Sequence, residues 1–338
     1  MRIEKGRARS AHHNSNFKIQ NSKFAVADAS GDTDGVTINL KELLALREEA
    51  RRLHLTPRGK VLATRSGGHL SRFRGRGMEF DESRIYQPGD DVRNMDWRVT
   101  ARAGTAHVKL FREERERPVW LLVDLGPRMR FGTRVAFKSV TAARAAALLA
   151  WAAVDRGDRV GGLVFDETRH RELRPASRTR GVLPLLNALA APPRPDAGRG
   201  FAGVGEAAER LVRLVRPGSL VFLLSDFTGI DLEHSSWLAQ LAAGSELVLT
   251  LVRDPLETQA PPPGRYAVTD GLVTGLLDTS GRRRRDGYRR RFADHRALLE
   301  MLALRHHAHF MELGTEQPPG PTLAQGLLPR RERRRRSA

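Results

Sequence analysis

Residues 119–124 read VWLLVD, five large apolar side chains in a row followed by one aspartate. Because apolar and polar positions do not alternate, this run indicates a strand covered on both faces, as in the parallel sheets of α/β proteins. Three later runs share the pattern: 160–165 (VGGLVF), 220–224 (LVFLL) and 247–252 (LVLTLV). The four runs predict the central strands of one sheet.

Helical patterns separate these runs. Residues 135–154 are apolar or small nearly all round, which predicts a helix packed directly on the sheet. Shorter helices are expected at 182–190, 206–215 and 237–243. Strands that alternate with helices imply right-handed crossovers. We therefore predict an α/β fold with an open, mostly parallel sheet and helices on both faces.

The flanking regions extend this core. A strand is expected at 266–270, a long helix at 287–307 and an edge strand at 310–313. Before the core, a helix with one apolar stripe is expected at 38–55, and short strands at 79–85 and 106–113 form a small β-rich element. The proposed division is a disordered segment 1–37, the helix and β-rich element 38–117, the α/β domain with its extension 118–328, and a disordered basic tail 329–338.

Composition limits the functional classes. The 338 residues include no cysteine, which excludes disulfides and thiolate metal sites, and the net charge is +19. Much of the excess charge lies in two arginine-rich runs, 282–291 and 330–336, which lack interleaved aromatics or a recognition motif, so nucleic acid is not the expected partner. No signal peptide or membrane span is visible, and a cytoplasmic protein is expected.

Aspartates follow all four core strands: Asp124, Asp166, Asp226 and Asp254. The carboxyl ends of parallel strands share one edge, where ligands bind in open sheets, and carboxylates there can hold Mg²⁺. Alternatively, these aspartates only cap turns and helices. Phosphate-loop, zinc-protease and nucleophile-elbow motifs are missing from the sequence.

The densest group of charged and aromatic residues lies at 84–102, RIYQPGDDVRNMDWRVTAR. We name it the signature; its candidate site residues are Arg84, Tyr86, Gly89, Asp90, Asp91, Arg93, Asp96, Trp97, Thr100 and Arg102. The spacing allows a network of arginine–carboxylate pairs around the tryptophan. The signature is either a docking surface for a partner or the structural support of the β-rich element.

Three stretches together resemble the bacterial family known as domain of unknown function 58: GRGMEF (75–80), the signature, and VKLFREERERPVWLLVDLGPRMRFG (108–132). The resemblance covers about residues 40–255. It implies a von Willebrand factor A-like domain and a partnership with a MoxR-type AAA+ ATPase in chaperone-like complex assembly. Many relatives carry N-terminal membrane helices, which this sequence lacks.

The same resemblance implies where a metal would bind. A working adhesion-type site has Asp-x-Ser-x-Ser after the first strand, a threonine from a middle loop and an aspartate after the fourth strand. Here Asp124 and Asp226 match, but Gly126 and Arg128 stand at the two serine positions and 200–205 contains no hydroxyl. No metal or other cofactor is therefore expected, and Arg128 is predicted to supply the positive charge.

The sequence thus favours a non-enzymatic binding or scaffold protein whose partners are the ATPase and an unknown client protein. The alternative is a metal-dependent hydrolase or nuclease that uses the aspartates at the carboxyl edge of the sheet.

Overall fold

The computed structural model describes residues 18–19, 35–55, 78–88, 90–113, 116–191, 203–230, 236–269 and 274–327. The chain divides into two compact units: unit 1 comprises Met1–Gly59 and Pro118–Ala338, and unit 2 comprises Lys60–Arg117. Most of the predicted segment 1–37 and the whole tail 329–338 lie outside the described residues. In the described helices, none is long and apolar enough to cross a membrane.

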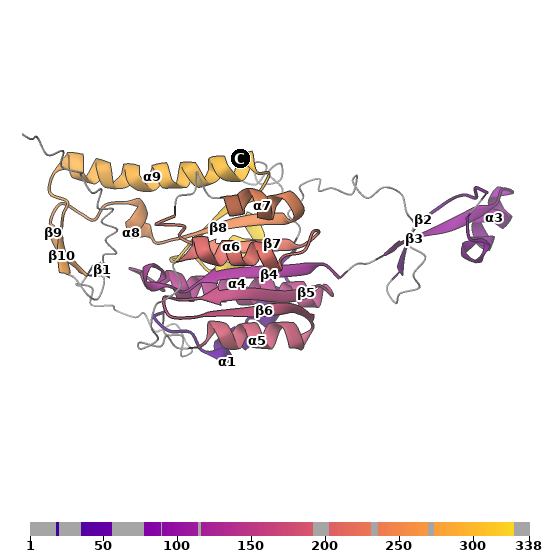
Figure 1. Cartoon of the computed structure of the whole chain (residues 1–338), viewed down its shortest axis with the longest axis horizontal. Coiled ribbons are helices and arrows are strands. Elements are labelled where there is room, and N and C mark those ends of the chain that lie inside the picture. Colours follow the sequence, from indigo (N-terminus) through magenta and orange to yellow (C-terminus); the bar gives the residue numbers. More distant parts are fainter. Residues whose placement is uncertain are drawn as a thin grey trace, which may run out of the picture. The chain divides into compact units, whose positions relative to one another are not determined.

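Unit 1 contains a six-stranded sheet in the order β11-β8-β7-β4-β5-β6 (Figure 1). Its strands are β4 (Pro118–Asp124), β5 (Arg159–Phe165), β6 (His170–Ser177), β7 (Leu220–Ser225), β8 (Glu246–Arg253) and β11 (His309–Gly314). All neighbours are parallel except β5 and β6. The predicted mostly parallel sheet, its four central strands and the edge strand at 310–313 are confirmed.

Two glycines let β5 approach its neighbours closely. A Cβ on Gly162 would lie 2.6 Å from the Leu121 carbonyl oxygen, and one on Gly161 would lie 2.4 Å from that of Leu173. Real Cβ atoms do not come that near to backbone, so the glycines are required by the pairing of β5 with both strands.

Helices cover both faces of the sheet. One face packs against α1 (Leu40–Ala45), α2 (Arg47–Ala50), α4 (Lys138–Asp155), α5 (Thr179–Leu189) and α10 (Pro319–Gly326). The other face packs against α6 (Val204–Leu214), α7 (Ser236–Gly244) and α9 (Arg282–Arg305). The expected helices at 135–154, 182–190, 206–215, 237–243 and 287–307 are therefore confirmed, with small shifts at their ends.

The helix expected at 38–55 is split into α1 and α2 and packs on α4. The Trp151 indole donates a hydrogen bond to the Leu43 carbonyl at 3.1 Å, and the Arg47 guanidinium lies 5.1 Å from the centre of the Trp151 ring. The sequence grouped this helix with the β-rich element, but these contacts are made with the α/β unit.

Several smaller elements were not predicted from the sequence. A hairpin of β9 (Arg265–Thr269) and β10 (Thr274–Asp278) pairs with β1 (Lys18–Ile19), and the four-residue helix α8 (Pro255–Thr258) follows β8. Only the strand at 266–270 was expected. The antiparallel strand β6 was missed because its side chains are mostly half-buried or exposed, so it shows no apolar run.

Unit 2 contains an antiparallel pair, β2 (Met78–Ile85) and β3 (His107–Glu113), close to the predicted strands. Between them lie a single 3-10 turn, η1 (Val92–Asn94), and the helix α3 (Trp97–Ala103), which was not predicted. Met95 bridges to Val108, which places this connection along the second side of β3. The helix α3 ends at Gly104, whose φ of 71° is the left-handed conformation that favours glycine.

Candidate functional site

The sheet of unit 1 reverses its winding between β4 and β7. The chain leaves β4 through α4 on one face and leaves β7 through α7 on the other face. In open α/β sheets such a reversal leaves a crevice at the carboxyl ends of the strands, and this crevice is the usual ligand site. Asp124 ends β4 and Asp226 follows β7, so both carboxylates lie at this point.

The crevice is filled by the side chain of Lys138. Its ammonium donates hydrogen bonds to Asp226 Oδ2 at 2.8 Å and to Glu257 Oε1 at 2.6 Å, and it lies 6.0 Å from the centre of the Phe131 ring. The side chain is 1% exposed. A lysine from the first turn of α4 is therefore the cation of this site, and we name Lys138, Asp226, Glu257 and Asp124 the lysine cluster.

Electrostatics explain how Lys138 stays charged among Asp226 and Glu257 although it is buried. Burial alone would lower the pKa of Lys138, but the Asp226 and Glu257 carboxylates outweigh burial and raise that pKa. Burial would likewise raise the pKa of Asp226, and the Lys138 charge instead holds it below its usual range. A cation at a helix N-terminus also opposes the helix dipole, so the carboxylates stabilise α4 as well.

Asp124 behaves differently from Asp226. Burial, and then the charge of Asp226, raise the pKa of Asp124 to about 6, although Ser225 Oγ and the Gly126 N–H donate hydrogen bonds to its carboxylate at 2.7 and 2.9 Å. Lys138 forms an ion pair with Asp226. It lowers the pKa of Asp124 only slightly, through its charge at longer range. Asp124 can therefore take up a proton near neutral pH. Burial also raises the pKa of Glu257, although the Lys138 charge opposes that rise.

We expect Asp124→Asn to gain stability relative to the wild type as the pH rises from 4 to 7. Between these values the folded wild type retains a proton that the unfolded chain releases, so its free energy of unfolding falls by roughly 2 kcal/mol. Asparagine has no such titration. Urea unfolding at a series of pH values measures the difference between the two proteins, and a difference that is constant with pH would contradict the raised pKa.

Asp166 and Asp254 take the capping role. Asp254 is fully buried, caps α8 and accepts hydrogen bonds from the hydroxyls of Thr133 and Thr315, both at 2.6 Å. Asp166 accepts from the backbone and hydroxyl of Thr168 and from Arg169. Turn and helix capping therefore accounts for these two aspartates.

Arg128 lies at the carboxyl edge, as predicted, but its contact is not an ion pair with either carboxylate. Its guanidinium donates to the Thr228 hydroxyl at 3.0 Å, and that hydroxyl donates to Asp226 Oδ1 at 2.8 Å. The sequence assigned the neutralising charge to Arg128; the structure assigns it to Lys138. The Lys138 side chain reaches Asp226 from the first turn of α4, whereas the Arg128 side chain extends to Thr228.

The residues present do not fit an adhesion-type metal site. The position beside Asp226 is held by the Lys138 ammonium, which repels a cation. The nearby hydroxyls of Ser225 and Thr228 already donate to Asp124 and Asp226. Among the described residues, no group of three or more histidines, aspartates or glutamates has the geometry of a metal site.

Sequence reasoning missed Lys138, and a signal was available. Only seven of the 58 basic residues are lysines, and Lys138 starts a helix whose residues are mostly apolar and buried. A lysine in such a place, in a chain that otherwise uses arginine, suggests a need for a compact ammonium. Glu257 had no comparable signal because it is distant in sequence and enters the cluster through α8.

In unit 2, several candidate residues of the signature have local structural contacts, and Arg84, Asp90 and Asp96 form side-chain pairs or caps. Arg84 donates to Asp90 at 2.7 Å, and Asp96 caps α3 and accepts from the Ser83 hydroxyl at 2.8 Å. The carboxylates of Asp90 and Asp96 accordingly have pKa values below their usual range, because Gln87 and Ser83, respectively, donate hydrogen bonds to them.

Three further signature residues have local roles. Thr100 accepts the His107 N–H at 2.9 Å, Asp91 accepts the Arg93 N–H at the start of η1, and the Tyr86 N–H donates to the Ala106 carbonyl. Gly89 lies outside the described residues.

The remaining signature residues point outward. Trp97 is 67% exposed although it is the first residue of α3, and the neighbouring Arg93, Arg98 and Arg102 are exposed too. Arg84 and the acidic residues therefore have the structural role predicted from the sequence. The docking role stays a prediction for the exposed Trp97 and the arginines beside it.

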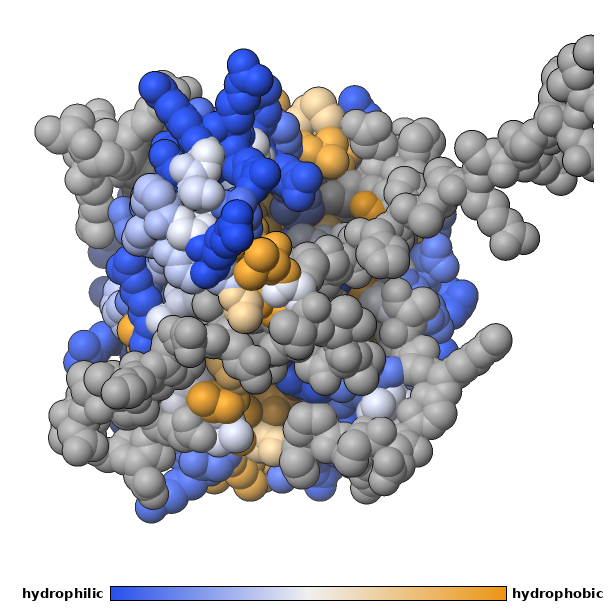
Figure 2. Space-filling model, turned by 90° about the vertical axis from the view of Figure 1, so that its left-hand side faces the viewer, coloured by the Kyte–Doolittle hydropathy of each residue, from blue (hydrophilic) through white to orange (hydrophobic). Residues whose placement is uncertain are grey.

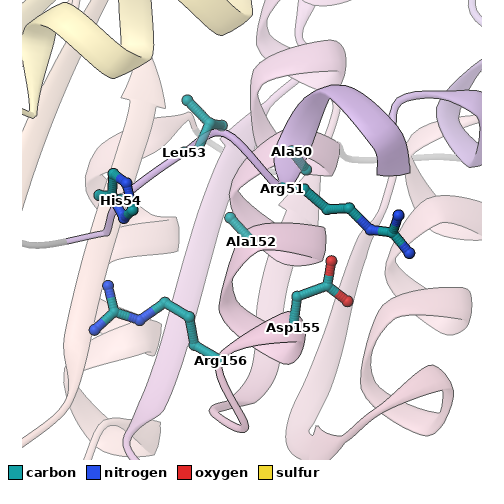
Figure 3. Close-up of a pocket in the computed structure, with 7 residues that line it drawn as sticks. All are labelled: Ala50, Arg51, Leu53, His54, Ala152, Asp155 and Arg156. Carbon is teal, nitrogen blue, oxygen red and sulfur yellow. The ribbon is translucent and has the colours of Figure 1, made fainter.

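Among the hollows on the described part of unit 1, one lies at the carboxyl edge and another at the far end of α4. Figure 2 looks onto the carboxyl edge, where hydrophilic side chains gather above and apolar ones show below them. The other hollow, of about 770 Å³, lies at the far end of α4, about 27 Å from Lys138 along that helix. Figure 3 shows His54 and Arg156 on one side of it and Arg51 and Asp155 on the other. This polar, open depression is not at the strand ends that form ligand sites.

The described geometry defines an α/β protein whose ligand crevice is closed by its own lysine, linked to a small β unit with an exposed aromatic signature. The chain belongs to the family described as protein of unknown function DUF58, whose model matches residues 82–298.

Relatives of the chain are uncharacterized proteins. Rv1480 of Mycobacterium tuberculosis and Mb1516 of Mycobacterium bovis are each 34% identical to it over 252 residues, which is 73% of this chain and 78% of each relative. Among solved structures, conserved hypothetical protein BatB from Bacteroides thetaiotaomicron matches with 17% identity and a TM-score of 0.40, over 62% of this chain and 97% of that one.

Proposed function

We propose that this chain is a non-enzymatic binding protein that works with a MoxR-type AAA+ ATPase in the chaperone-like assembly or maturation of a client protein. The exposed part of the signature is the observation that carries the proposal. The identity of the partner rests on the family resemblance of the sequence. We also propose that unit 1 is von Willebrand A-like, on the strength of the same resemblance and of the matching positions of Asp124 and Asp226.

The surface chemistry of unit 2 suits protein recognition. Tryptophan and arginine are the residue types most enriched among those that dominate binding energy. Asp90 is paired with Arg84, and Asp96 is buried. Arg93, Arg98 and Arg102 are exposed and outnumber the exposed Asp91. The surface is therefore apolar and positively charged, and the complementary partner surface is an acidic one with a pocket for the indole.

The lysine cluster supports the same conclusion for unit 1. A metal-dependent hydrolase would need carboxylates free to hold a metal with its water. The Asp226 and Glu257 carboxylates instead bind Lys138, and Asp124 is hydrogen-bonded to Ser225. No observation on the described residues favours the alternative of a metal-dependent hydrolase.

We expect Trp97→Ala to weaken binding to the purified ATPase about 30-fold while the melting temperature changes little. The indole is mostly exposed, so its removal costs the folded chain little, whereas a central aromatic contact is worth about 2 kcal/mol in a complex. Arg98→Glu should weaken binding as well, and more at low than at high salt. Biolayer interferometry with the full-length chain, in ATP and in ADP, measures both.

Leu304→Ala is the matched control because this leucine is also exposed but lies on α9 of unit 1. It should bind as the wild type does. Asp91→Ala is a poorer test because it also removes the cap of η1. If Trp97→Ala and Arg98→Glu bind the ATPase with unchanged affinity, the signature is not the docking surface and the proposal fails.

A further inference from the structure

We infer that the carboxyl edge of unit 1 carries a docking site for an acidic polypeptide segment, which places one large apolar side chain in a cavity beside Asp166. The cavity has a volume of about 300 Å³. Its apolar walls include Val36, Ile38, Leu125, Phe137, Val140 and Leu189. This surface belongs to unit 1 alone, so the inference does not depend on the ATPase or on the signature.

The cavity is built by segments that are firmly joined. The Phe137 N–H, at the start of α4, donates to the Gly35 carbonyl at 2.8 Å. A Cβ on Gly35 would lie 2.1 Å from the Val135 carbonyl oxygen, so only glycine allows the segment 35–38 to lie this close to the loop before α4. The cavity is therefore formed before anything binds, which lowers the entropic cost of binding.

The size of the cavity and its rim favour a polypeptide over a small molecule. A volume of 300 Å³ is at the lower limit of small-molecule pockets and suits one large side chain. Apolar surface also continues outside the cavity, since Val135, which does not line it, is 61% exposed. A ligand confined to the cavity would leave Val135 in water, whereas a longer segment covers it.

The charges around the cavity select an acidic segment. The nearest acidic side chains are already paired: Asp166 with Arg169 at 3.0 Å, and Glu167 with Arg130 at 2.7 Å. Arg134, next to Val135, is exposed and forms no ion pair with another residue of the described part of the chain. Positive charge therefore remains unneutralised beside the apolar rim, and carboxylates of a partner complement it.

Fluorescence anisotropy with synthetic peptides and the full-length protein tests this site. The probe is a short labelled peptide of glutamates with one central leucine; the matched probes carry alanine in place of leucine, or lysines in place of the glutamates. We expect saturable binding of the acidic leucine peptide, at least tenfold weaker binding of the alanine peptide, and none of the basic peptide. Equal binding of the leucine and alanine peptides would overturn the inference.

Two variants locate the binding. Ala190→Phe fills the cavity from the end of α5 and should abolish binding, and Arg134→Glu, at an exposed position, should weaken it about tenfold even if the first variant does not fold. Arg216→Glu, an exposed arginine just before β7 and hence at the opposite edge of the sheet, is the control and should bind as the wild type does.

Unchanged affinity in Arg134→Glu would contradict the site. A second result would also contradict the site: decanoate binds, and the acidic peptide cannot displace it. The cavity would then bind a small amphiphile instead of a polypeptide segment.

Discussion

Replacing Lys138 by methionine is expected to lower the free energy of unfolding by about 3–5 kcal/mol at neutral pH. The change keeps the length of the side chain but leaves Asp226, a buried carboxylate, without its counter-charge. For a protein with an ordinary stability of 5–15 kcal/mol this is a large loss. Urea unfolding followed by circular dichroism measures it, and the loss should shrink on acidification, when Asp226 becomes protonated.

A second substitution separates the charge from the packing. Lys138→Met combined with Asp226→Asn removes both members of the ion pair and should recover part of the stability lost by Lys138→Met alone. A double variant that is the sum of its single variants would show that the ammonium does not act through Asp226. Arg216→Met, the loss of an exposed cation, is the control and should change the stability by less than about 0.5 kcal/mol.

Leu148→Ala is expected to cost about 2–5 kcal/mol. Leu148 is fully buried in the middle of α4, in the cluster of apolar side chains that joins this helix to the sheet. Truncation leaves a cavity that tightly packed neighbours cannot fill, because most residues around it on α4 are alanines with no side chain to move. Chemical denaturation measures the cost.

The comparison for this prediction is Leu304→Ala, the same substitution at a leucine of α9 that is 61% exposed. Its effect should be small. If Leu148→Ala lost less than about 0.5 kcal/mol, the position assigned to α4 against the sheet would be wrong.

The sequence predicted the elements that are buried on both sides and missed those that are not. The run 119–123 could only be a central strand, because five consecutive apolar side chains need cover on both faces. The edge strand β6 and the helix α3 have no such requirement, since their side chains face partly into water and their polar residues fit a loop equally well.

The candidate site could be predicted from the sequence only in part, and the reason differs from that for the fold. Asp124 and Asp226 were placed correctly at adjacent strand ends because parallel topology dictates where strands finish. The partner cation could not be chosen in the same way, because it depends on which side chain reaches the crevice in three dimensions. Arg128 is close in sequence to Asp124, but the side chain that enters the crevice is that of Lys138, on the helix that follows.

The charge that balances Asp226 is covalently attached to the chain. A diffusible ion would occupy such a crevice in proportion to its concentration, and a chelator would remove it. A tethered ammonium has a fixed and high effective concentration, so this neutralisation is permanent under all ionic conditions in which the protein is folded. The pKa of Asp124, raised to about 6, leaves a charge at this edge that a change of pH alters. The lysine cluster is therefore expected to respond to acidity.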